Sequence, residues 1–312
     1  MSGIVDYKVE SDEEALIKIR SLVDKFAPSK GKSDLFSRVE PRDPAFDIDE
    51  IYGILPADRA KPYNTRQIIA RLVDASEFDE YKAGYGQTIL CGYARIDGWA
   101  VGIVANNREI CKSGKGEMQV GGVIYSDSAD KAARFILNCN QRGIPLVFLQ
   151  DVTGFMVGTR AEQGGIIKDG AKLVNAVANS IVPKFTIVLG NSYGAGNYAM
   201  CGKAYDPRLI YAWPTAQIAV MGGSQAAKTV LTIKVAALEK QGEKLTPEKQ
   251  QELLREIQAK YEATTTPVYA ASRLWVDGII APTETRRVIS CGIAVASHQG
   301  TLPELKTGVF QV

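Results

Sequence analysis

The sequence predicts an α/β fold in which parallel strands alternate with helices. From about residue 51, the apolar runs Pro145–Leu149 and Lys184–Leu189 alternate with the helical patterns Ala129–Arg142 and Gly164–Ser180. Parallel strands need long crossover connections, and helices usually supply them. Glycine-rich segments follow both apolar runs, which indicates a tight turn between each strand and the next helix.

The chain is expected to begin with a helix over Glu13–Phe26, where apolar residues recur at helical spacing. Ser11 is its expected N-cap, and Glu14 stands three residues later, as in a capping box. The next segment, Pro28–Asp49, is rich in Pro, Ser, Lys and Asp and is typical of a linker. Residues 1–50 are therefore expected to form an N-terminal helix and linker, and residues 51–312 a compact domain.

The compact part is predicted to open with a helix over Thr65–Val73. Strands are expected at Thr88–Ile96 and Trp99–Ala105, because the Asp97-Gly98 pair between them is a strong hairpin signal. Further along, a glycine-rich turn is expected at Gly190–Gly196.

A charged segment of helical pattern, Lys228–Tyr261, interrupts the strand and helix alternation. It predicts a projecting helical arm at about residues 228–262. Two uses of such an arm stay open, a solvated surface feature or an interaction arm in an oligomer.

Composition and charge exclude several classes of function. The 312 residues include 37 Lys and Arg against 35 Asp and Glu, a net charge of +2. This balance gives no reason to expect nucleic acid or an anionic membrane as a partner. The single histidine, His298, cannot complete a Cys/His zinc site, so no metal is expected.

The expected location is the cytoplasm. Five widely spaced cysteines suit free thiols in a reducing compartment, and the first residues contain no apolar signal sequence. The uncharged stretch Leu209–Ala227 is long enough to span a bilayer, but its proline, glycines and glutamines indicate a buried strand and turn.

Residues 190–194 have the pattern G-x-S-x-G, which is typical of a hydrolase nucleophile on a sharp turn between strand and helix. Asp277 and His298 follow Ser192 in the chain order of a catalytic triad. His298 lies in a polar segment, however, where a solvated histidine is the ordinary state. A serine hydrolase that uses Ser192 is therefore kept as a remote alternative.

Two glycine-rich turns, residues 151–158 and 190–196, are the best candidates for a ligand site. Small residues allow a substrate to approach the backbone, and a helix that follows directs free amides toward it. Such a turn can hold an oxyanion through amides alone. Turns that serve only packing are the other interpretation of the same pattern.

Several motifs of this chain resemble the C-terminal domain of the beta subunit of biotin-dependent acyl-CoA carboxyltransferases. They run in order through most of residues 51–312: YGILP at 52–56, KPY at 61–63, PLVFLQDVTGFMVG at 145–158, GIIKDGAK at 165–172 and WPTAQIAVMGG at 213–223. The sequence SYGAGNY at 192–198 is closer to the 3-methylcrotonoyl-CoA carboxylase type than to the propionyl-CoA carboxylase type.

The resemblance implies a crotonase-like (ClpP/crotonase) superhelix of ββα units. Complete members have two such domains, an N-terminal one for acyl-CoA and a C-terminal one for biotin. The chain is thus expected to be the biotin-side half of an enzyme that transfers a carboxyl group between carboxybiotin and an acyl-CoA such as 3-methylcrotonoyl-CoA or propionyl-CoA. The carboxyltransferase chain of a biotin-dependent decarboxylase, of the glutaconyl-CoA type, is the alternative.

The resemblance also implies partners. Biotin would arrive on a biotin carboxyl carrier domain, charged by a biotin carboxylase subunit, and the N-terminal carboxyltransferase domain would bring acyl-CoA. Because that domain is not in the sequence, the chain is expected to be incomplete as an enzyme on its own. It is also expected to self-associate through helices around Ile166–Ala178 and surfaces near Met221–Ala227.

The same resemblance assigns roles to residues of the two turns. The amides of Ala195 and Gly196 would face the ureido oxygen of biotin, and the backbone carbonyl of Phe155 would face a ureido nitrogen. Three further residues would line the biotin pocket, namely Gly158, Gly194 and Tyr198.

Overall fold

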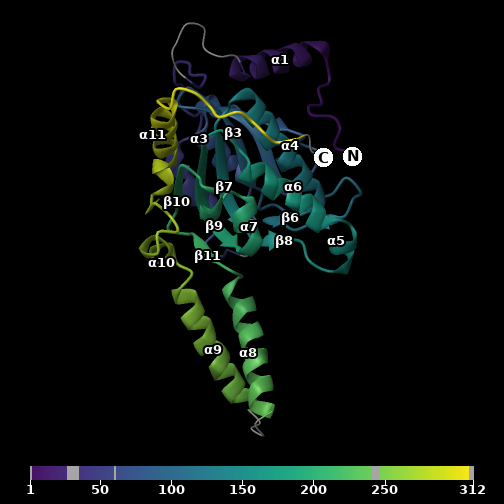
Figure 1. The fold of residues 1–312 in the computed structure, drawn as a ribbon, viewed down its shortest axis with the longest axis vertical. Helices are drawn as coiled ribbons and strands as arrows, with labels where there is room; N and C mark the ends of the chain where they lie inside the picture. Colours follow the sequence, from purple (N-terminus) through teal and green to yellow (C-terminus); the bar gives the residue numbers. More distant parts are fainter. Residues whose placement is uncertain (1, 27–34, 60, 241–245, 309–312) are drawn as a thin grey trace.

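The computed structural model describes residues 2–26, 35–59, 61–240 and 246–308 (Figure 1). Its centre is a mixed sheet of eight strands in the order β1-β2-β3-β7-β9-β10-β12, with β11 paired to β9. The strands are β1 (Asp79–Tyr81), β2 (Ile89–Ile96), β3 (Trp99–Asn106), β7 (Leu146–Val152), β9 (Lys184–Tyr193), β10 (Leu209–Ala212), β11 (Gln217–Ala219) and β12 (Gly278–Ile279). All pairs from β3 to β12 are parallel, which confirms the predicted α/β fold.

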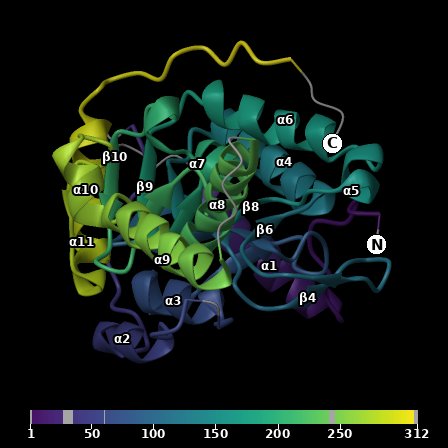
Figure 2. The same cartoon turned by 90° about the horizontal axis from the view of Figure 1, so that it is seen from below.

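Helices cover both faces of this sheet, and each face has its own apolar core (Figures 1 and 2). α4 (Ser126–Arg142) and α6 (Ile166–Ala178) pack on one face, where Phe135 and Leu173 are fully buried. α3 (Thr65–Leu72) and α11 (Thr285–Ser297) pack on the other face. The shorter elements are α2 (Ile51–Ile54), β4 (Cys111–Lys112), β5 (Met118–Gln119), β6 (Val123–Ile124), β8 (Gly154–Phe155), α5 (Thr159–Gln163), α7 (Gly194–Ala199) and α10 (Pro267–Ser272).

Local sequence signals predicted the strands β2, β3 and β7 and the helices α3, α4 and α6. Asp97 and Gly98 both have positive φ, 52° and 80°, as a two-residue hairpin turn requires, and they join β2 to β3 as predicted. The predicted end of β9 was wrong, because the strand continues through Gly190 to Tyr193. An ideal Cβ at Gly190 would lie 2.6 Å from the Asp151 carboxylate, so glycine makes room for that side chain within the strand.

The arm predicted at 228–262 is present as two helices, α8 (Gly223–Lys240) and α9 (Pro247–Ala263). They run side by side and project from the body of the molecule (Figure 1). The hydroxyl of Tyr261 joins the arm to the turn after β11, since it donates to the Met221 carbonyl at 2.9 Å and accepts from the Met221 amide at 3.2 Å. No helix in the described part of the chain is both long and apolar enough to cross a membrane.

The N-terminal helix α1 spans Asp12–Phe26. The Glu14 amide donates to the Ser11 hydroxyl at 3.2 Å, which confirms Ser11 as the N-cap. The second bond of the predicted capping box, from the Ser11 amide to the Glu14 carboxylate, was wrong. That carboxylate accepts from the Glu10 amide instead.

Residues 35–50 are not the linker that their composition predicted; residues 28–34 of that prediction lie outside the described chain. Phe36 is only 2% exposed and belongs to the core on the α3 side of the sheet. Arg38 stacks on Trp99, with its guanidinium carbon 4.7 Å from the ring centroid. A few anchoring side chains therefore fix a segment that is polar on average.

α1 is attached to the sheet through Asp79, which is 6% exposed. Its carboxylate accepts hydrogen bonds from Lys18, Ser21 and Lys25, each at 2.7 Å, and Lys25 is itself buried. Burial alone would raise the pKa of Asp79, but the hydrogen bonds from Lys18, Lys25 and Ser21, together with the charge of Lys25, hold that pKa below its ordinary value.

We expect Asp79→Asn to lower the free energy of unfolding at pH 7 by about 2 kcal/mol, because it leaves the buried Lys25 without a counter-ion. A carboxylate with a depressed folded-state pKa stabilises above its unfolded-state pKa, and this contribution is lost as the pH falls through the folded-state pKa. The difference between the two proteins should therefore shrink from pH 7 to about pH 3. Urea unfolding at both pH values measures it, and an unchanged difference would contradict the assignment.

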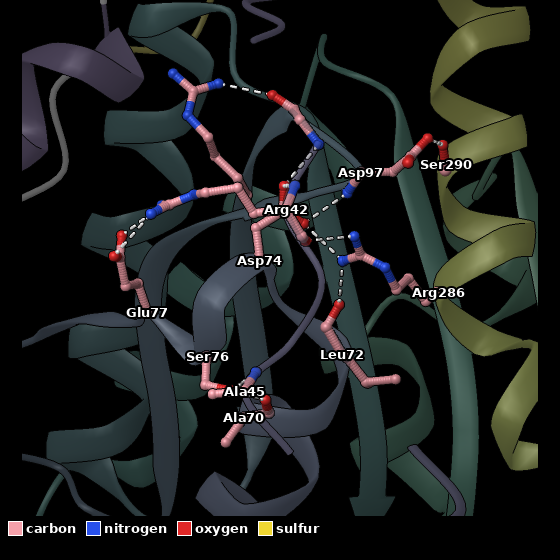
Figure 3. Close-up of polar contacts among 12 residues, drawn as sticks. Arg42, Ala45, Ala70, Leu72, Asp74, Ser76, Glu77, Asp97, Arg286 and Ser290 are labelled. Atoms are coloured by element: carbon pink, nitrogen blue, oxygen red, sulfur yellow. Dashed lines mark hydrogen bonds and ion pairs between the residues drawn. The ribbon is translucent and has the colours of Figure 1, made fainter. Parts of the chain in front are cut away.

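A second buried carboxylate, Asp74, joins four segments (Figure 3). It is 1% exposed and accepts hydrogen bonds from the amides of Arg42, Asp97 and Gly98 and from the Arg286 guanidinium, the last at 2.6 Å. The N-terminal segment, the end of α3, the β2–β3 turn and α11 thus meet at one side chain.

Candidate functional site

The candidate site lies where two neighbouring parallel strands, β7 and β9, end. Val152 at the end of β7 is paired with Ser192 near the end of β9. The segments that follow, β8 and α7, are therefore brought together, although they are about forty residues apart in the chain. The sequence predicted a glycine-rich turn after each of these strands, and the pairing of β7 with β9 brings the two together.

α7 begins at Gly194 without a capping side chain. The amides of its first residues, Gly194, Ala195 and Gly196, precede the first turn of helical hydrogen bonds and have no acceptor within the helix. Ala195 is exposed and Gly196 is buried. These amides, together with the positive end of the helix, provide donors suited to an oxyanion.

The buried Gly196 allows α7 to lie directly against the end of β7 and the start of β8. An ideal Cβ at this position would lie 2.6 Å from Val152 Cγ2 and 3.2 Å from Gly154 Cα. Any larger side chain would push α7 away from β8, so glycine sets the spacing of the two turns.

The backbone carbonyl of Phe155 faces away from the neighbouring strand β6. The Met156 amide donates to the Ile124 carbonyl of β6 at 2.8 Å. Because a trans peptide directs its N–H and C=O to opposite sides, the carbonyl of Phe155 in the same peptide unit faces away from β6. The phenyl ring packs over Gly170 of α6, where an ideal Cβ would be 2.8 Å from Phe155 Cε1.

Four of the six predicted site residues lie together, and the other two, Gly158 and Tyr198, lie outside this cluster. Phe155, Gly194, Ala195 and Gly196 meet at the junction of β8 and α7. Gly158 precedes α5, is exposed and lines a separate surface cavity of about 790 Å³. Tyr198 lies on α7 with 46% of its surface exposed, and its ring contacts that of Tyr205 at 5.9 Å between centroids.

The nucleophile interpretation of Ser192 was wrong. Ser192 lies within β9 and is fully buried. Its hydroxyl donates to Gln150 Oε1 and accepts from Asn197 Nδ2, both at 2.7 Å. The partners expected of a triad are engaged elsewhere, since the Asp277 carboxylate binds Lys203 and the Ile210 amide, and His298 follows the end of α11.

Gln150 and Asn197 were missed by the sequence analysis. Gln150 also donates to the Met200 carbonyl at 2.6 Å, so the chain Gln150–Ser192–Asn197 ties α7 to both β7 and β9. A glutamine directly after an apolar strand was the available signal, because a buried amide needs several partners. The serine therefore positions the helix that carries the candidate amides.

We expect Ser192→Ala to keep most of the activity, with a loss of less than about tenfold, or roughly 1.4 kcal/mol, because the hydroxyl is buried and supports α7 through Gln150 and Asn197. A serine-directed fluorophosphonate should not label the chain. Steady-state rates and mass spectrometry measure the two outcomes. Labelling at Ser192 would contradict this assignment.

Asp151, near the end of β7, links this strand to the end of β9. Its carboxylate accepts from the Asn191 amide at 2.9 Å and from the Tyr63 hydroxyl at 2.8 Å, and Arg108 Nε is 3.4 Å away. Burial raises the pKa of Asp151, and the charge of Arg108 and the bond from Asn191 reduce this effect without cancelling it. The arrangement fixes the ends of β7 and β9 relative to each other.

Comparison with known proteins is informative over the whole chain. A family model described as "Carboxyl transferase domain" matches residues 1–310, so the match includes the segment before the expected boundary at residue 51. The biotin-dependent 3-methylcrotonyl-coenzyme A carboxylase beta1 subunit of Mycobacterium tuberculosis is 43% identical over all of this chain and 56% of its own length. The mitochondrial methylcrotonoyl-CoA carboxylase beta chain of Dictyostelium discoideum is also 43% identical, over 50% of its length.

Solved structures agree in fold. The transcarboxylase 12S structure, described as a hexamer assembly, aligns with a TM-score of 0.83 and 34% identity over all of this chain and 57% of that one. The beta subunit of P. aeruginosa geranyl-CoA carboxylase aligns with a TM-score of 0.72 and 37% identity over all of this chain and 56% of that one. The chain spans about half the length of the relatives that it matches.

Proposed function

Because the chain belongs to the carboxyl transferase domain family, we propose that it forms the biotin-side half of an acyl-CoA carboxyltransferase. The crotonase-like fold is shared with the beta subunit of geranyl-CoA carboxylase, and a 43% identical relative is named as a biotin-dependent carboxylase subunit. The observation that carries the proposal is the junction of β8 and α7, where uncapped amides and an outward carbonyl lie on adjacent turns.

The residues at this junction fit the ureido group of biotin. A cyclic urea has one carbonyl oxygen, which accepts hydrogen bonds, flanked by nitrogens that donate. The Ala195 and Gly196 amides would donate to the oxygen, and the Phe155 carbonyl would accept from a nitrogen. Gly194, with a φ of 51°, lets the chain turn from β9 into α7 beside this group.

Carboxybiotin, when bound there, would supply the carboxyl group and leave negative charge on its ureido oxygen. The chain would contribute amides that are already oriented when this charge develops, so that no side chain has to reorganise. Gly196 would keep α7 close enough to β8 for both sets of contacts. We propose that Tyr198 and Gly158 contact the biotin or its carrier domain, since both are exposed beside these turns.

We propose that acyl-CoA, a biotin carboxyl carrier domain, a biotin carboxylase subunit and an N-terminal carboxyltransferase domain are the partners. The relatives' names support this proposal, since they are beta chains of carboxylases for methylcrotonyl-CoA or are named for methylmalonyl-CoA transfer. A 3-methylcrotonoyl-CoA or similar acyl group is the proposed substrate. A cytoplasmic location is also proposed, and five free cysteines support it.

The test measures carboxyl transfer from a carboxylated acyl-CoA to free biotin methyl ester, with a radiolabel on the transferred carboxyl group. The chain alone should give little or no transfer, and a separately produced N-terminal carboxyltransferase domain should restore it. Efficient transfer by the chain alone would contradict the proposal. So would the absence of transfer when both the N-terminal domain and the holoenzyme partners are added.

Self-association is a further expected result. Ile167 on α6 and Val220 before α8 are large apolar side chains with 74% and 75% exposure, in the two regions proposed as contacts. Burial of exposed apolar side chains such as these favours association. Light scattering at tens of micromolar should give a dimer or a larger species, and Ile167→Lys should shift the mass toward that of the monomer. A monomer for the unchanged chain would contradict the expectation.

A further inference from the structure

A polar cavity of about 610 Å³ opens beside the β8–α7 junction, and none of the residues proposed to contact biotin lines it. Thr153 and Tyr193 line it; Thr153 directly precedes β8, and Tyr193 directly precedes α7. A second cavity of about 290 Å³ reaches Asp151. Arg59 and Asn191 line both cavities, so Arg59 stands at their common wall.

The guanidinium of Arg59 is exposed and makes no hydrogen bond or ion pair with any residue that the structure describes. The two acidic residues on the cavity wall, Asp58 and Glu262, both have partners; that of Glu262 is the Gln258 side-chain amide at 2.7 Å. The positive charge of Arg59 is close enough to Tyr193 and Asp151 to act on both. The cavity wall therefore carries a guanidinium, that of Arg59, whose N–H donors are free to bind an anion next to the end of β9.

The position of Arg59 is fixed from behind by Arg108, which is only 7% exposed. Arg108 Nη2 donates to the Arg59 carbonyl at 2.9 Å, and its Nε lies 3.4 Å from the Asp151 carboxylate. Gly121 and Gly122 make this possible, because a Cβ at either position would collide with Arg108. A buried guanidinium thus connects the Arg59 loop to the carboxylate beneath the proposed reaction site.

We propose that Arg59 binds the carboxylate that the reaction places on the acyl group, with Arg108 as its positioning residue. This inference rests on the proposed function, in which carboxyl transfer takes place at the β8–α7 junction, directly after Thr153 and Tyr193. The planar guanidinium matches a carboxylate with two parallel hydrogen bonds. The phosphates of CoA are separated from the thioester by the whole pantetheine arm, so an anion this close to the turns belongs to the acyl end.

Malonate is the probe for this site, titrated into the isotopically labelled chain by NMR. Saturable shifts are expected at the Arg59 Nε–H and at the Asn191 amide. Arg59→Gln should weaken malonate binding at least about tenfold, whereas Arg134→Gln, an exposed arginine on α4, should leave it unchanged. Arg108→Gln should shift the Arg59 Nε–H signal before any malonate is added, and circular dichroism checks that this variant folds.

Three results would overturn the proposal: no saturable shift at Arg59, an affinity unchanged by Arg59→Gln, or tighter binding of inorganic phosphate than of malonate at the same signals. No biotin is present in this titration. Its failure would therefore leave the biotin-side assignment intact, and failure of carboxyl transfer with intact malonate binding would reject the function while keeping the site.

Discussion

Replacement of Gly196 by Asp should reduce carboxyl transfer by roughly 100–1000-fold, or about 2.7–4 kcal/mol, the usual effect of losing one oxyanion donor. The new carboxylate would stand at the start of α7, where the proposed ureido oxyanion forms, and would oppose the positive end of the helix. Its Cβ would also meet Val152 Cγ2, which lies 2.6 Å from the ideal position, and displace the amide. The rate is measured in the reconstituted enzyme.

The matched control is Ala195→Ser, because Ala195 is exposed and the change keeps both amides in place. It should retain most of the activity. Circular dichroism and urea unfolding of both variants separate a local loss of donors from global unfolding. Near-normal activity of Gly196→Asp together with a collapse in Ser192→Ala would contradict the amide mechanism.

Replacement of Asp74 by Ala should lower the free energy of unfolding by about 3–5 kcal/mol, the range for removing one partner of a buried ion pair. The change removes the counter-ion of Arg286, which keeps only the Leu72 and Arg42 carbonyls as acceptors, and it removes the acceptor of the Asp97 and Gly98 amides at a site that is 1% exposed (Figure 3). Urea unfolding at pH 7 measures the loss.

Glu77→Ala is the control for Asp74→Ala in the same network. The pair of Glu77 with Arg42 is about half exposed on both sides, so its loss should cost only about 0–1 kcal/mol. Equal losses in the two variants would show that the buried position of Asp74 does not set its contribution.

The sequence predicted the elements whose signals are local. The Asp97-Gly98 turn and the helices around 129–142 and 164–180 depend on neighbouring residues only, and all of them are present. The packing of residues 35–50 was not predictable in this way, because it depends on distant partners. Arg286, for example, binds Asp74 across 212 positions, and nothing near either residue indicates that pair.

The candidate site was predicted only in part, because some of its signals are local and others depend on distant partners. Glycine patterns indicated two turns after two strands, and the parallel pairing of β7 with β9 brings those turns together. The strand character of Ser192 was missed, since a glycine before it suggested a turn. Only the structure shows that the Asp151 carboxylate occupies the space beside Gly190 and that Gln150 binds the serine hydroxyl.

The most direct test of the proposed biotin site is an NMR titration of the labelled chain with biotin methyl ester. The predicted result is a saturable shift of the Ala195 and Gly196 amide signals, absent in Gly196→Asp and retained in Ser192→Ala. Saturable binding that leaves both amide signals unchanged, or shifts confined to other parts of the chain, would contradict the assignment of these amides to the ureido oxygen.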